Sequence, residues 1–312
     1  MIAVNAEIRS RMSSDAAPLI PELAAHLIEA GGKRLRPVLT LAAAKLCGYE
    51  GSHHIRLAAT VEFIHTATLL HDDVVDESDR RRGRETANIL WGNKAPVLVG
   101  DFLFSRSFQL MVETENLRVL EILSNASAVI AEGEVLQLSL ANRVTADDTQ
   151  YMRVIRGKTA ALFEAATQVG GVIAGASAEE EEALATYGDA LGIAFQLVDD
   201  ALDYGGKAAA LGKRVGDDFR EGKATLPVIL SYAQGDETER AFWTRCMEPR
   251  HQVDGDLEQA LTYLTASGSI DATVARASDH IDRATKALGR FKPSPMGDAL
   301  IDVADFVVSR VS

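Results

Sequence analysis

Apolar residues recur three or four positions apart along most of this chain, the spacing of one face of an α-helix. The pattern is clearest in residues 57–71, 179–204, 257–267 and 270–288. The Ala, Leu, Glu and Arg residues in these runs favour helices. No Asn-Gly or Asp-Gly pair joins two strand-like runs, and the eight prolines stand where helices are expected to begin or end. The pattern therefore predicts an all-α protein.

The chain shows no sign of division into separate parts. No Pro-, Gly- or Ser-rich linker and no internal repeat interrupts it. Its 312 residues suffice for a sizeable core, so residues 1–312 are predicted to form a single domain. The polar, charged stretch 234–256 is expected to be a surface excursion.

The charge balance narrows the classes of partner. Lys and Arg number 32 against 45 Asp and Glu, and the net charge of −13 argues against a nucleic-acid partner. The longest uncharged stretch has fourteen residues, 165–178, fewer than the about 20 that a transmembrane helix needs. Cys47 and Cys246 match no zinc or redox spacing, and the N-terminus has no signal-peptide pattern. A cytoplasmic location is therefore expected.

A first cluster of aspartates, Asp72, Asp73 and Asp76, follows an apolar run. On a helix, Asp72 and Asp76 lie on one face, where like charges cost about 0.2–0.5 kcal/mol. A divalent cation would neutralise them, and ligands that are all oxygen suit Mg²⁺. The alternative is a solvated acidic helix end. A calcium loop is excluded because the glycine and distal glutamate of that motif are missing.

A second cluster, Asp199, Asp200 and Asp203, repeats the same spacing after another apolar helix. Burying unpaired carboxylates costs several kcal/mol each, so two such clusters are hard to assign to a solvated surface. The repetition predicts two facing carboxylate walls around a Mg²⁺-bound diphosphate group.

Basic residues complete this picture. Arg80, Arg81, Arg82 and Arg84 follow the first cluster, and arginine suits bidentate phosphate contacts. Lys33 and Arg36 are expected beside a helix N-terminus, which binds anions. Lys213 and Lys223 follow the second cluster, although each alone is typical of a surface lysine. Residues 157–159 resemble the tail of a P-loop, but Met152 replaces its first glycine and excludes that motif.

Together these segments resemble the trans-type isoprenyl diphosphate synthases. The matches, in family order, are GGKRLRP (31–37), LLHDDVVDESDRRRG (69–83), GDFL (100–103), GKT (157–159), FQLVDDALDY (195–204) and GKATLP (222–227). Residues 303–310 also look like the family's ending. The resemblance implies antiparallel helices around a central active-site cavity, usually in a homodimer. It also implies that an allylic diphosphate and isopentenyl diphosphate are joined head to tail.

Each matching residue then takes an implied role. The Mg²⁺ ligands are Asp72, Asp76, Asp199 and Asp203, supported by Asp73 and Asp200. The residues that hold isopentenyl diphosphate are Lys33, Arg36, His65 and Arg82. The residues that hold the allylic diphosphate are Arg81, Lys158, Thr159, Gln196, Lys213 and Lys223. The role of His65 outranks the alternative that His65 and His71 are packed core histidines.

Two other classes of protein share parts of the pattern. A class I terpene cyclase also ionises prenyl diphosphates, but rarely needs a second DDxxD cluster and the site at Lys33 and Arg36. A catalytically inactive regulatory subunit typically loses aspartates, and here both clusters are intact. Consumption of isopentenyl diphosphate by the purified chain separates these alternatives.

Product length is predicted from Thr68 and Ala67, four and five residues before Asp72. At these positions they lie beneath the carboxylate face of the helix, where a growing tail passes. Short-chain members carry an aromatic residue there, so two small side chains predict a long product of about 40 to 50 carbons. Residues 62–78 also look most like the long-chain members that make quinone side chains. This resemblance implies a product for quinone side chains, and transient membrane contact on its release is expected. The alternatives are a short-chain product and small residues that serve only helix packing. A deeper tunnel floor is expected at Phe104, Phe108 or Met111.

Overall fold

The computed structural model describes residues 1–29, 32–81, 83–141, 143–145, 147–205, 215–247 and 251–311. Nearly all of its regular structure is helical, which confirms the prediction of an all-α protein. The chain forms two compact units. The first unit comprises residues 1–127 and 165–185, and the second comprises residues 128–164 and 186–312.

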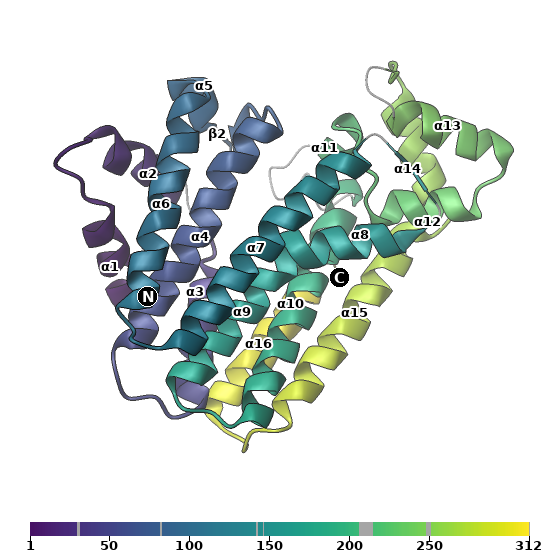
Figure 1. The fold of residues 1–312 in the computed structure, drawn as a ribbon. Coiled ribbons are helices and arrows are strands. Elements are labelled where there is room, and N and C mark those ends of the chain that lie inside the picture. Colours follow the sequence, from purple (N-terminus) through teal and green to yellow (C-terminus); the bar gives the residue numbers. More distant parts are fainter. Residues whose placement is uncertain are drawn as a thin grey trace. The chain divides into compact units, whose positions relative to one another are not determined.

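The first unit contains the N-terminal helices and one short pair of strands (Figure 1). Its elements are α1 (Ile2–Met12), α2 (Leu19–Glu29), α3 (Leu35–Leu46), α4 (His53–Val75), β1 (Arg80–Arg81), β2 (Arg84–Glu85), α5 (Ala87–Trp91) and α6 (Lys94–Val112). The two-residue strands pair antiparallel directly after the first aspartate cluster. The sequence pattern did not predict this turn.

The remaining helices belong to the second unit or to both. Three helices contribute residues to both units: α7 (Leu117–Leu140), α9 (Ala161–Ile173) and α10 (Ala178–Tyr204). The second unit also contains α8 (Asp148–Ile155), the π-helix η1 (Arg156–Ala160), α11 (Asp217–Arg220), α12 (Leu226–Gln234), α13 (Glu237–Met247), α14 (Asp256–Ala266), α15 (Ser269–Leu288) and α16 (Pro295–Ser309).

Helix α4 is the central element of the first unit. Its side chains are buried on most of its circumference, and it runs beside α6 (Figure 1). The two helices are antiparallel, because Arg56 near the start of α4 contacts Glu113 at the end of α6, whereas His71 near the end of α4 contacts Val97. A helix that is buried all round carries a weak amphipathic signal but is held firmly by packing. This packing anchors the end of α4 that carries the first aspartates.

Gly100 allows α4 and α6 to approach closely at that end. A Cβ atom added at Gly100 would lie 2.3 Å from Nε2 of His71. The same ring nitrogen lies 3.1 Å from the carbonyl oxygen of Val97 and 3.6 Å from a carboxylate oxygen of Asp101. His71 therefore packs in the helix contact next to Asp72.

The four segments with helical periodicity are helices, with ends within a few residues of those predicted. Prolines stand in the first turn of α2, α3, α6, α12 and α16. Proline is tolerated there because its missing N–H would have no partner within the helix. These boundaries were predictable because they depend on local stereochemistry.

The expectation of a surface excursion at 234–256 was wrong in part. Residues Glu237–Met247 form α13, and Trp243, Cys246 and Met247 are fully buried. The Trp243 indole N–H donates to Ser231 Oγ at 3.2 Å, and Phe242 packs edge-on against its ring. Polar residues dominate the exposed face, so the few large apolar ones were too sparse to reveal the buried face.

None of the helices in the described residues is both long enough and apolar enough to cross a membrane.

Candidate active site

The first aspartate cluster stands at the C-terminal end of α4. Asp72 and Asp73 lie in its last turn, and Asp76 is the C-cap, whose backbone N–H donates to the carbonyl of Asp72 at 2.8 Å. Asp72 and Asp76 are half-buried, whereas Asp73 is fully buried. The predicted pairing of Asp72 and Asp76 on one helix face therefore has a structural basis.

Asp73 is compensated by a cation from the same unit. Arg81 of β1 donates from Nε to Asp73 Oδ1 at 2.7 Å. Burial raises the pKa of Asp73, and the charge and hydrogen bond of Arg81 oppose that rise. Arg81, predicted to hold the allylic diphosphate, thus pairs with a carboxylate of the cluster.

A second group of cations lies where α3 begins. Arg36 Nη1 is 3.3 Å from Nε2 of His65 on α4, so two residues predicted to hold isopentenyl diphosphate come together. Lys33 is exposed in the preceding loop. Burial lowers the pKa of Arg36 to about 10, and the charge of Glu62 opposes the effect. Arg36 therefore remains a cation at neutral pH.

Glu62 was not predicted from sequence. It accepts a hydrogen bond from Arg34 at 2.5 Å, and Arg34 is the N-cap of α3 with a left-handed backbone at φ 48°. Non-glycine residues rarely adopt this conformation, so the ion pair helps to hold the turn between Lys33 and Arg36. The signal was a single acidic residue in the largely apolar stretch 57–71.

The second aspartate cluster stands at the C-terminal end of α10. A carboxylate oxygen of Asp199 lies 3.6 Å from Nη2 of Arg310, whose guanidinium also covers the ring of Phe195 at 5.3 Å. Asp203 accepts backbone N–H bonds from Asp217 at 3.2 Å and from Asp218 at 3.1 Å. Asp203 thereby joins the end of α10 to the start of α11.

Asp200 is buried among uncharged donors. Tyr151 on α8 donates its hydroxyl to Asp200 Oδ2, and Gln196 Nε2 donates to Oδ1 at 2.7 Å. Thr159 of η1 donates its hydroxyl to Gln196 Oε1 at 2.9 Å. Burial raises the pKa of Asp200 to about 7, which these hydrogen bonds only partly oppose. The predicted residues Thr159, Gln196 and Asp200 therefore form one connected group.

The π-helix η1 presents Lys158 and Thr159 through a close helix contact. A Cβ atom at Gly133 would lie 2.8 Å from the backbone nitrogen of Lys158, and one at Gly157 would lie 3.0 Å from Gly133 Cα. Lys158 Nζ forms an ion pair with Glu134 at 3.0 Å. Single-turn π-helices often occur at functional sites. Glycines inside helical patterns were the sequence signal for this contact.

The structure describes one of the other three predicted cations. Lys223 forms an ion pair with Glu221 at 2.8 Å. Arg82 and Lys213 lie outside the described residues. Arg310 ends the segment 303–310, for which the sequence predicted no role.

The two chain-length residues differ in their surroundings. Ala67 is fully buried in the hydrophobic cluster where α4 meets its neighbours, whereas Thr68 is half-buried and bonds to the carbonyl of His65. Of the three expected floor residues, Phe104 and Phe108 stack edge to face at 5.4 Å, and Met111 is fully buried. Thr68 therefore offers the more open side chain of the pair.

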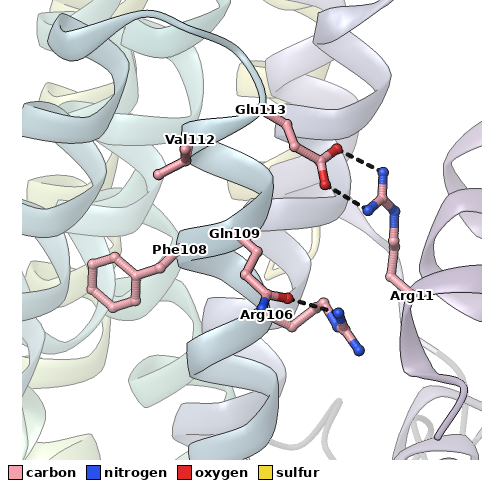
Figure 2. Close-up of a pocket in the computed structure, with 6 residues that line it drawn as sticks. All are labelled: Arg11, Arg106, Phe108, Gln109, Val112 and Glu113. Carbon is pink, nitrogen blue, oxygen red and sulfur yellow. Dashed lines mark hydrogen bonds and ion pairs between the residues drawn. The ribbon is translucent and has the colours of Figure 1, made fainter.

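A surface pocket of about 550 Å³ lies near the end of α4 that is opposite the aspartates, because Arg56 at the start of α4 contacts Glu113 of its lining. It is lined by Arg11, Arg106, Phe108, Gln109, Val112 and Glu113. Figure 2 shows Arg11 in a two-pronged ion pair with Glu113. Both N–O distances in this pair are 2.7 Å. The pocket contains no aspartate cluster, and about 24 Å of helix separates Arg56, a neighbour of Glu113, from Asp72.

Comparison with known proteins identifies the family. The polyprenyl synthetase model matches residues 17–264. The octaprenyl diphosphate synthase of Escherichia coli is 48% identical over 99% of this chain and 95% of its own length. The geranylgeranyl diphosphate synthase of Methanosarcina mazei is 33% identical over 91% of this chain and 88% of its own length. The chain belongs to the polyprenyl synthetase family, whose members are prenyltransferases.

Solved structures agree with this assignment. A decaprenyl diphosphate synthase from Rhodobacter capsulatus superposes with a TM-score of 0.96 at 64% identity, covering all of this chain and 96% of the other. A polyprenyl synthase from Caulobacter crescentus, complexed with calcium and isoprenyl diphosphate, gives 0.95 at 53% identity, covering all of this chain and 95% of the other. The sequence identification and the all-α fold are thereby confirmed.

Proposed function

We propose that this chain condenses an allylic diphosphate, such as farnesyl diphosphate, repeatedly with isopentenyl diphosphate to make a long-chain all-trans polyprenyl diphosphate. The relatives named octaprenyl and decaprenyl diphosphate synthases are 48% and 64% identical, against 33% for the geranylgeranyl enzyme. The observation that carries the chemistry is the hydrogen bond between Thr159 and Gln196 beside Asp200. It joins residues that two separate motifs assign to the allylic substrate.

Divalent cations are part of the proposal, with Mg²⁺ as the metal, Asp72 and Asp76 as the ligands of the first cluster, and Asp199 and Asp203 as the ligands of the second cluster. These donors are all carboxylate oxygens, as Mg²⁺ prefers. Among the described residues, no three His, Cys, Asp or Glu side chains are grouped so that they could hold a metal alone. In proteins Mg²⁺ typically uses one or two carboxylates and takes its other ligands from substrate phosphates and water. Bound there, it supplies positive charge to the departing diphosphate.

The cations of the chain bind and orient the two substrates. Arg36 and His65 meet at 3.3 Å and, with Lys33 and Arg82, are proposed to hold isopentenyl diphosphate. Lys158, Lys213, Lys223 and Arg81 are proposed to hold the allylic diphosphate. Fixing two reactants in line supplies the entropic part of catalysis.

The difficult step is cleavage of the allylic carbon–oxygen bond, whose electron pair leaves with the diphosphate. The hydroxyl of Thr159 and the amide of Gln196 are proposed to stabilise the allylic cation through their dipoles. The isopentenyl double bond then attacks the cation and forms the new carbon–carbon bond. A proton leaves the adduct, and the released diphosphate accepts it. The apolar surroundings must exclude water, which would otherwise quench the cation.

Several broader expectations belong to the same proposal. They are a homodimer, a cytoplasmic location, transient membrane contact on product release and a product used for quinone side chains. The family model spans residues 17–264 and so includes parts of both compact units, which supports one catalytic domain.

The test is incubation of the purified chain with farnesyl diphosphate, radiolabelled isopentenyl diphosphate and Mg²⁺, followed by chromatography of the dephosphorylated products. All-trans polyprenols of about 40 to 50 carbons are expected, because small residues below Asp72 leave room for a growing tail. Products that stop at about 20 carbons would assign the chain to the short-chain synthases. Failure to consume isopentenyl diphosphate would overturn the proposal.

A further inference from the structure

Tyr151 lies beside the second aspartate cluster, and neither the motifs nor the proposed function gives it a role. It stands on α8 with 8% of its surface exposed. Its hydroxyl donates to Asp200 Oδ2, and burial raises the pKa of the phenol well above its usual value. The hydroxyl therefore remains protonated and keeps its donor role.

The bonds around Asp200 have a defined direction. Oδ2 accepts from Tyr151 and Oδ1 accepts from Gln196 Nε2. The nitrogen end of the Gln196 amide therefore faces Asp200, and its oxygen end accepts the hydroxyl proton of Thr159. Because a threonine hydroxyl has one proton, the Thr159 oxygen can offer only lone pairs to anything else. The lone pairs of such an oxygen stabilise a nearby carbocation.

The hydrogen bonds form a chain from Tyr151 through Asp200 and Gln196 to Thr159, so Tyr151 and Thr159 stand at its two ends. A carboxylate bonded at one oxygen can rotate about its last torsion, which has a broad energy profile. Bonds at both oxygens, from α8 and from α10, hold the carboxylate plane. When that plane is held, a flip of the Gln196 amide is unfavourable. The flip would replace the donor Nε2 by the acceptor Oε1 and place it against an acceptor oxygen of Asp200.

We infer that Tyr151 is a positioning residue for prenyl transfer, which holds Asp200 and, through it, the Gln196 amide and the Thr159 hydroxyl in the orientation that stabilises the allylic cation. The inference rests on the proposed function. It assigns Tyr151 no contact with substrate. The hydroxyl should therefore matter when the carbon–oxygen bond breaks, and little when the ground-state substrate binds.

The test compares two Tyr→Phe variants that each lose one buried hydroxyl. Tyr151→Phe removes the bond to Asp200, and the control Tyr187→Phe removes a 2.7 Å bond to the carbonyl of Leu300. Tyr187 is fully buried on the same helix as Gln196. We expect Tyr151→Phe to slow the first condensation in single-turnover experiments about tenfold. We expect Tyr187→Phe to stay within about twofold of wild type, with a similar fall in Tm.

Two further readouts separate positioning from a structural effect. The first readout is the Kd, with Mg²⁺, of the thiodiphosphate analogue of farnesyl diphosphate, whose carbon–sulfur bond resists cleavage. This Kd should change less than about twofold in Tyr151→Phe. The second readout uses a Thr159→Val background, in which Tyr151→Phe should slow the reaction less than about twofold. The effects of substitutions at residues that act as a unit are not additive.

Each contrary outcome has a defined meaning. A wild-type rate in Tyr151→Phe, an equal loss in the Thr159→Val background, or an equal loss in Tyr187→Phe would overturn the inference. So would a Tyr151→Phe chain that does not fold while Tyr187→Phe does, since Tyr151 would then be structural. A wild-type chain that forms no prenyl product would instead overturn the proposed function.

Discussion

The two aspartate clusters share one sequence pattern but differ in how their middle carboxylates are stabilised. At the end of α4, Asp73 is fully buried and pairs with Arg81 at 2.7 Å. At the end of α10, Asp200 is equally buried but is bonded by the neutral groups of Tyr151 and Gln196. Burial raises the pKa of both carboxyls, to about 7 for Asp200.

From this difference we expect the two clusters to have separate tasks. An ion pair neutralises charge within the first cluster and leaves Asp72 and Asp76 at its half-buried edge. The second cluster holds a buried carboxylate with two neutral donors and connects it to Thr159. Asp200 receives hydrogen bonds at both carboxylate oxygens, whereas Arg81 donates to one oxygen of Asp73 and also supplies a positive charge. We therefore expect the second cluster to be the more sensitive to loss of single hydroxyl groups.

The largest effect should come from removing one outer aspartate of either cluster. Asp72→Ala and Asp199→Ala should each lower turnover at least about 100-fold, which corresponds to about 3 kcal/mol of transition-state stabilisation. Steady-state kinetics across a Mg²⁺ titration measures the loss, and excess chelator should abolish wild-type activity. Asp79→Ala, at an exposed aspartate three residues beyond Asp76, is the control and should retain near-normal rates. Near-normal turnover in either cluster variant would refute the shared metal role.

The next effect tests the ion pair of the first cluster. Arg81→Gln should lower the free energy of unfolding of substrate-free protein by about 2–3 kcal/mol, because it leaves Asp73 buried without its cation. Arg310→Gln should cost less than about 1 kcal/mol, since its 3.6 Å contact reaches the more exposed Asp199. Urea denaturation measures both values. Equal losses of unfolding free energy in Arg81→Gln and Arg310→Gln would contradict the proposed difference in how the two clusters are stabilised.

A pH series tests the buried carboxyl of the second cluster. Because its pKa is raised, native Asp200 binds more protons than unfolded Asp200 between about pH 4 and pH 7. Its contribution to the unfolding free energy is therefore highest at acid pH, falls as the pH rises through this window and is flat above it. Asp200→Asn should stabilise metal-free protein at pH 8 by about 1–2 kcal/mol, because part of the cost of burying a charge disappears.

The control for that series is the same substitution measured at pH 5, where Asp200 is already protonated. The gain there should be clearly smaller than at pH 8, because pH 5 lies near the acid end of the window in which the contribution of Asp200 falls. A gain of equal size at pH 5 and pH 8 would mean that Asp200 does not titrate in this window.

The smallest effect on rate should come from the chain-length residues, which precede the first cluster on α4. Thr68→Tyr should leave the first condensation unchanged and shorten products to about 15–20 carbons, because the ring lies one turn before Asp72. Ala67→Tyr should do the same but lose about 1–3 kcal/mol of stability, since Ala67 is fully buried. Chromatography of the product alcohols measures chain length, and Thr68→Ser is the control. Wild-type product length in both variants would refute the tunnel prediction.

Much of the site was predictable because its residues lie close together in sequence. Asp72 and Asp76 share a helix face by their spacing alone, and the same holds for Asp199 and Asp203. Lys33 and Arg36 share one loop and helix start. The partners from distant segments were not predictable in this way: Glu62 for Arg34, Glu134 for Lys158 and Arg310 for Asp199.

The sequence by itself determined the helical class, most helix boundaries, the two aspartate clusters and the family, because periodicity, capping and motif spacing are local properties of a chain. The tertiary structure decided what each carboxylate meets. Whether a buried aspartate contacts a guanidinium, as Asp73 does, or a phenol and an amide, as Asp200 does, depends on segments that are distant along the chain. Burial and partner together determine a carboxyl pKa, so two identical motifs acquire different electrostatics only when the helices have packed.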